Sequence, residues 1–118
     1  MAELGRATRD GLIAGDYPLK TEAIIITGPA DFKRGDVVGR TIGGAFALTD
    51  SAQSNGLQNP IGIISDDVVV ETGETATAVI YVKGEFSERF LQFGGTDTAD
   101  THRRHMTEIG LMIRETKV

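Results

Sequence analysis

The sequence predicts a small, mainly β domain of the α+β class, with one short helix near its C-terminus. Three short runs rich in apolar and β-branched residues occupy residues 60–64, 66–70 and 76–82. Glycines separate or end these runs, and brief apolar runs between glycines are typical of strands. With fifteen glycines and 40% hydrophobic residues among 118, the composition suits one compact domain with many tight turns.

The run at 76–82 has largely apolar residues on both faces, because side chains alternate along a strand. Ala78 and Ile80 lie on one face, and Val79 and Tyr81 lie on the other. We therefore expect this strand to be covered on both sides. We expect a turn at 83–85, followed by the centre of the core in the aromatic segment that contains Phe86, Phe90, Leu91 and Phe93.

Strands and turns are also expected earlier in the chain. The β-branched run at 22–27 predicts a strand, and Gly43 and Gly44 predict a hairpin turn between two apolar runs. Residues 49–59 are polar and predict a loop.

A helix is expected after the aromatic segment. Asp97, Thr98 or Asp100 is a suitable N-terminal cap, and we expect the helix to end near residue 106 or 107. A final strand is predicted from Ile109, Leu111, Met112 and Ile113, after Gly110 closes the helix.

The chain is divided by composition into two parts. Residues 1–20 have few large apolar side chains and no consistent period, so they predict a flexible arm. Residues 21–118 form the predicted β-rich domain.

Charge and composition argue against several classes of protein. The net charge is −5, and residues 41–82 carry five acids and no bases, whereas a nucleic-acid-binding protein has a basic stripe. There is no apolar run near 18 residues and no secretory signal pattern, so we expect neither a membrane span nor a leader. The absence of cysteine excludes disulfides and thiolate metal sites.

Two short patterns suggest alternative functions. Arg34-Gly35-Asp36 is a tripeptide that can bind integrins, although its context between apolar residues favours a turn. His102 and His105 are three residues apart on the expected helix and would suit one metal ion, with Glu108 a turn further on. A solvated or interface face is the more frequent role of such histidines. We therefore predict no catalytic residues, no metal and no cofactor.

Several segments together resemble the head decoration proteins of tailed bacteriophages, the lambda type. The resemblance is carried by the strand at 60–64, by the run and Lys-Gly-Glu-Phe corner at 77–86, and by the basic short helix at 102–104. The final strand at 109–114 and the glycine-rich turns of 32–48 are also similar to this family.

The resemblance implies a homotrimer on the outer surface of the virion, made in the host cytoplasm. It would bind the major capsid protein of the expanded head at three-fold and quasi-three-fold positions and stabilise the capsid against packaged DNA. It also implies that the N-terminal arm adds a strand to a capsid sheet. In this chain the candidate arm residues are Gly11, Leu12, Ile13 and Ala14 for the strand, with Tyr17, Pro18 and Leu19 anchoring it to the domain.

Overall fold

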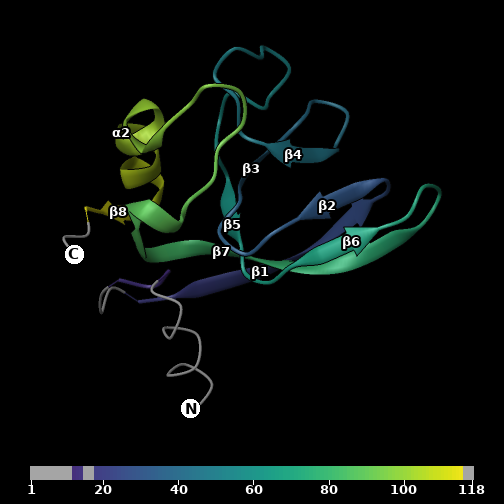
Figure 1. Cartoon of the computed structure of the whole chain (residues 1–118), viewed down its shortest axis with the longest axis horizontal. Helices are drawn as coiled ribbons and strands as arrows, with labels where there is room; N and C mark the ends of the chain where they lie inside the picture. Colours follow the sequence, from purple (N-terminus) through teal and green to yellow (C-terminus); the bar gives the residue numbers. More distant parts are fainter. Residues whose placement is uncertain (1–11, 15–17, 116–118) are drawn as a thin grey trace.

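The structure is a computed structural model that describes residues 12–14 and 18–115 of the chain. Within these residues it contains eight strands, one 3-10 turn and one α-helix (Figure 1). The elements are β1 (Lys20–Thr27), β2 (Ala30–Phe32), β3 (Val37–Arg40), β4 (Phe46–Leu48), β5 (Gly62–Ile64), β6 (Val68–Val70), β7 (Thr75–Ser87), η1 (Glu88–Phe90), α2 (Ala99–Ile109) and β8 (Leu111–Arg114).

The strands form a six-stranded sheet and a separate two-stranded ribbon. The order in the sheet is β1-β7-β5-β3-β4, with β8 also paired to β7, and the ribbon consists of β2 and β6. The first half of β7 pairs with β1 and β5, whereas its second half pairs in parallel with β8. The predicted mainly β fold with one C-terminal helix is therefore confirmed, and β7 is its longest strand.

The core is divided into two clusters along β7. One cluster joins the second half of β7 to α2 and β8 and includes the fully buried Phe86 and Met106. The other joins the first half of β7 to β1, β5 and the ribbon, and includes the fully buried Ile64 and Ile80. Figure 1 shows the corresponding layout, with α2 and β8 at one end of the molecule and the ribbon at the other.

The prediction that the strand at 76–82 is covered on both faces is wrong for most of its length. Ala78 and Ile80 are buried, but Thr77 is exposed and Val79 is 41% exposed. The cause is that the β2–β6 ribbon packs against only one face of the β1–β7 pair. The second face is covered from Tyr81 onward, where its ring lies 5.3 Å from that of Phe86.

The turn predicted at 83–85 is also wrong, because β7 continues without interruption to Ser87. A Cβ atom on Gly84 would lie 2.8 Å from Leu19 Cδ2 and 2.8 Å from Phe86 Cζ, so this glycine permits close packing rather than a reversal. The partner of β7 changes here instead, from β1 to β8. The predicted aromatic centre is partly correct, since Phe86 is fully buried whereas Phe90 is 38% exposed.

Helix α2 follows Thr98, one of the three predicted caps. It ends at Ile109, where Gly110 takes a left-handed conformation with φ of +98°. Ile109 therefore belongs to the helix and not to the final strand, contrary to the prediction, whereas Leu111 and Ile113 share the buried face of β8 as expected. No helix in the described residues has the length and apolar character needed to span a membrane.

The other predicted elements hold. Strand β1 includes all of 22–27, and β3 and β4 form a hairpin around Gly43 and Gly44. Residues 49–59 form a loop without strand or helix.

Candidate functional site

The predicted strand of the N-terminal arm is paired with the domain itself. Ile13 forms an antiparallel bridge with Phe86 of β7. The Ser87 N–H donates to the Leu12 carbonyl (2.7 Å), and the Ala14 N–H donates to the Glu85 carbonyl (2.9 Å). Because β8 occupies one edge of this part of β7, residues 12–14 occupy the other.

The side chains of this segment are core residues. Leu12 is 1% exposed and Ile13 is 8% exposed, and both belong to the cluster around Phe86. Leu19 is partly buried against the same cluster, and Pro18 is exposed. Leu12 and Ile13 are therefore packed against the body of the domain, although composition assigned them to the arm.

Two of the predicted arm residues cannot be compared with the structure. Gly11 and Tyr17 lie outside the described residues. The segment that precedes Leu12 also lies outside them.

The Arg34-Gly35-Asp36 tripeptide is a turn that is packed into the domain. Gly35 has φ of +97°, and Asp36 is 6% exposed with its carboxylate accepting the Lys33 N–H at 2.9 Å. The Arg34 guanidinium donates to the Ser65 carbonyl (2.7 Å). Both charged groups are thus directed at the domain, and this geometry favours the turn over the adhesion alternative.

Burial raises the pKa of Asp36, and the hydrogen bond from the Lys33 N–H opposes this effect without cancelling it. The ionised form of Asp36 is therefore disfavoured by the fold. A group of this kind acts in packing and turn geometry rather than as a presented negative charge.

The sequence favoured a solvated or interface face for the two histidines, but His102 is buried within the domain at 4% exposure. Its ring stacks on Phe93 at 5.4 Å, and its Nε2 lies 2.7 Å from Asp97 Oδ2. His105 lies one turn further along α2 and is half-buried. Among the described residues there is no group of three or more His, Cys, Asp or Glu side chains that would hold a metal ion.

Asp97 connects the loop before β5 to the start of α2. It accepts hydrogen bonds from the Ser51 N–H (2.6 Å) and the Ser51 hydroxyl (2.7 Å), in addition to its contact with His102. Burial raises the pKa of Asp97, but the hydrogen bonds from Ser51 and His102 outweigh it and leave this pKa below its ordinary value. The serine, aspartate and histidine form a structural network, because Ser51 contacts the carboxylate and not the imidazole.

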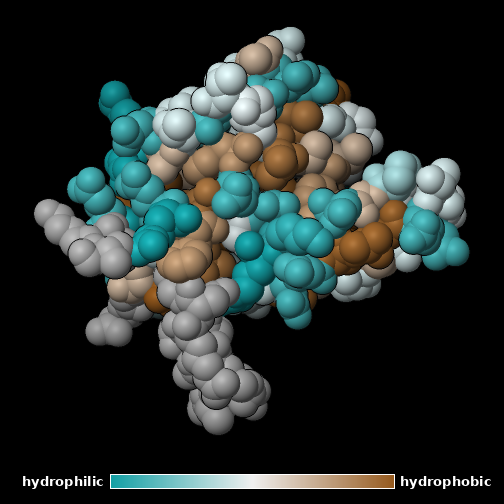
Figure 2. Space-filling model, in the orientation of Figure 1, coloured by the Kyte–Doolittle hydropathy of each residue, from teal (hydrophilic) through white to brown (hydrophobic). Residues whose placement is uncertain are grey.

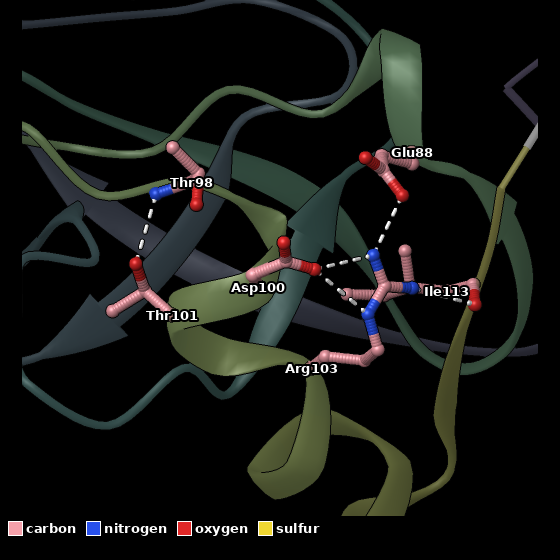
Figure 3. Close-up of polar contacts among 6 residues, drawn as sticks. All are labelled: Glu88, Thr98, Asp100, Thr101, Arg103 and Ile113. Carbon is pink, nitrogen blue, oxygen red and sulfur yellow. Dashed lines mark hydrogen bonds and ion pairs between the residues drawn. The ribbon is translucent and has the colours of Figure 1, made fainter.

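Arg103 forms a second polar network that the sequence did not predict. Figure 3 shows its guanidinium between two carboxylates, with Glu88 Oε1 at 2.6 Å and Asp100 Oδ1 at 2.9 Å from Nη2. Its Nη1 also donates to the Ile113 carbonyl at 3.3 Å. The hydrogen bonds that Arg103 donates to the carboxylates of Glu88 and Asp100 raise the pKa of Arg103 further. One side chain therefore ties η1, α2 and β8 together.

These observations define a structural domain: a compact β-rich body with an N-terminal segment paired on its central strand and polar side chains that join its elements. The chain matches the model of the bacteriophage lambda head decoration protein D family over residues 3–110, and it belongs to this family. The match covers most of the chain and supports a structural role at a phage capsid. A comparison with curated proteins finds no match.

Proposed function

We propose that the chain forms a homotrimer that binds the outer surface of the expanded phage head at three-fold and quasi-three-fold positions. There it contacts the major capsid protein and stabilises the shell against the pressure of packaged DNA. The observation that carries this proposal is membership of the head decoration family across residues 3–110. The rigid polar networks of Asp97 and Arg103 suit a protein that must keep its shape under load.

The N-terminal arm is proposed to contact the capsid, with two distinct parts. Residues 12–14 act as the root of the arm, because their backbone is bonded to β7 and Leu12 is in the core. The ten residues before Gly11 are then the part that reaches the capsid, and their fully extended length is about 35 Å. Strand addition suits this segment, since backbone pairing requires no particular side chains.

The test is binding of purified protein to expanded, undecorated heads, measured by co-sedimentation over a range of concentrations. A variant lacking residues 2–10 is expected to keep the wild-type melting temperature and oligomeric state but to lose most binding. A variant with the same residues in scrambled order is the matched control and should keep most binding. A third variant with prolines at alternate arm positions should lose it, because proline has no N–H to donate.

Full binding by the variant that lacks residues 2–10 would show that the body of the domain, and not the arm, attaches to the head. Failure of the full-length protein to bind any head would overturn the proposed function itself.

A further inference from the structure

One large apolar side chain is far more exposed than the other large hydrophobic side chains in the described residues. Ile42 is 88% exposed, whereas the next most exposed large hydrophobic residues, Ile25 and Val69, are each 60% exposed. Isolated exposed apolar side chains are common, but a group of them next to a hollow marks an interaction surface. Ile25 lines such a hollow, and Ile42 lies in the turn that contributes a further lining residue, Gly44.

Ile42 is held outward by a fixed turn between β3 and β4. The Thr41 N–H donates to the Ala45 carbonyl (2.7 Å), and the Gly44 N–H donates to the Thr41 carbonyl (2.9 Å). The Ile42 N–H donates to the Asn55 carbonyl (2.8 Å), so the polar loop supports the turn from behind. The side chain is therefore a preorganised projection, and little conformational entropy is lost when it binds.

A hollow of about 360 Å³ is lined in part by Gly44, which belongs to the same turn as Ile42. Strands β1 and β4 are the two edges of the six-stranded sheet, yet both contribute to its lining, so the sheet curves until its edges face each other. The apolar lining residues are Ile24, Ile25, Phe46 and Ile61. A cavity of about 150 Å³ already accepts benzene, so this hollow has room for an isoleucine side chain.

The charged residues at the hollow are complementary and lie on opposite walls. Glu22 is on the β1 wall, and Arg40 is on the wall that leads into the Ile42 turn. The Arg40 guanidinium lies over the Phe46 ring at 5.7 Å, and within the described residues neither Glu22 nor Arg40 has an ion-pair partner. A second copy that presents Ile42 also presents Arg40, which would face Glu22 of the first copy.

We propose that this surface is the contact between copies in the homotrimer: Ile42 of one copy enters the hollow between β1 and β4 of the next, with Arg40 opposite Glu22. The contact joins two different patches, so it is heterologous, and the three-fold rotation of the proposed trimer closes it into a ring. Because the turn that carries Ile42 also contributes Gly44 to the hollow, we place both the projection and the hollow close to the rotation axis. The inference rests on the proposed trimer and assigns the residues that build it.

The experiment compares Ile42→Asp with Val69→Asp by analytical ultracentrifugation over a wide dilution series, with circular dichroism to check folding. Val69 is the matched control, because it is an exposed hydrophobic on β6, where Figure 2 shows an apolar area separated from that over β4 by hydrophilic residues. Ile42→Asp should raise the concentration of half-dissociation about 100-fold, since three apolar contacts are lost in each ring. Val69→Asp should change it less than about threefold.

Two further variants keep the test decisive if Ile42→Asp folds poorly. Glu22→Arg and Arg40→Glu should each weaken the trimer, and the double variant should recover most of the loss. Because the chain has no cysteine, the Ile25→Cys, Ile42→Cys double variant should also give disulfide-linked trimers on oxidation.

A wild-type trimer that is unaffected by Ile42→Asp and by both charge reversals would overturn the assigned contact and leave the proposed trimer intact. A wild-type protein that is monomeric at micromolar concentration would instead overturn the trimer on which the inference depends.

Discussion

Replacing Leu12 by Ala tests whether the residues next to the arm are part of the core. Leu12 is 1% exposed and packs in the cluster that contains Phe86, Met106 and Leu111. Truncation of a buried leucine costs about 2–5 kcal/mol, through lost transfer free energy and the cavity that remains. The two backbone hydrogen bonds of residues 12–14 survive the change, so we expect a loss of about 3 kcal/mol.

This loss corresponds to a fall of about 12 °C in melting temperature, because a chain of this size has an unfolding entropy near 0.25 kcal/mol/K. Differential scanning calorimetry at fixed protein concentration measures it, with Val69→Ala as the exposed control that should shift by less than 3 °C. If Leu12→Ala melted within 3 °C of the wild type, Leu12 would not belong to the core, and residues 12–14 would not anchor the arm to the domain.

Three further predictions concern buried acids and a crowded glycine. Because the pKa of Asp36 is raised, its contribution to stability is present below its ordinary pKa and is lost as pH rises. In urea titrations, the free energy of unfolding of Asp36→Asn should therefore increase relative to that of the wild type between pH 3 and pH 7. An unchanged difference would contradict the burial argument. The pKa of Asp97 is lowered instead, so Asp97→Asn should reduce the free energy of unfolding by about 1–3 kcal/mol at pH 7, and by less below about pH 4. A loss that stayed constant down to pH 2 would contradict this assignment. A Cβ on Gly28 would lie 1.9 Å from the Glu71 carbonyl oxygen, so Gly28→Ala should prevent stable folding. Gly73 has open space around it, so Gly73→Ala should lower the free energy of unfolding, measured by chemical denaturation, by only about 1 kcal/mol.

The sequence was sufficient for the elements whose signals are local. Gly110 was expected to close the helix and does so, and Thr98 is one of the three caps that the sequence offered. The β-branched run at 22–27 needs no tertiary partner to be identified as a strand. The turn at Gly35 was likewise predicted correctly, because a glycine between charged residues and an apolar run favours a left-handed position.

Predictions that depended on long-range packing were less successful. Gly84 was assigned to a turn because glycine and flanking charges are typical of turns, but here the glycine makes room for Leu19 and Phe86 within a strand. The exposure of Val79 could not be predicted without the position of the ribbon, since alternation gives the two faces of a strand but not what covers them.

The candidate site shows the same limit. Leu12 and Ile13 are only two apolar residues between glycines, so their composition indicated an arm, and only the free edge of β7 explains why they are buried. His102 carried no signal of burial because its partners, Asp97 and Phe93, act through the fold rather than through helical spacing.

The continuity of β7 has a consequence for how the domain unfolds. Thirteen residues of one strand supply side chains to both hydrophobic clusters and backbone bonds to β1, β5, β8 and residues 12–14. Neither cluster can open globally without withdrawing this strand from the other, so the two halves should unfold in a single cooperative transition. Amide hydrogen exchange would then be slowest in the middle of β7, near Tyr81. Opening of either end of the strand would also increase the exchange rate at the other end.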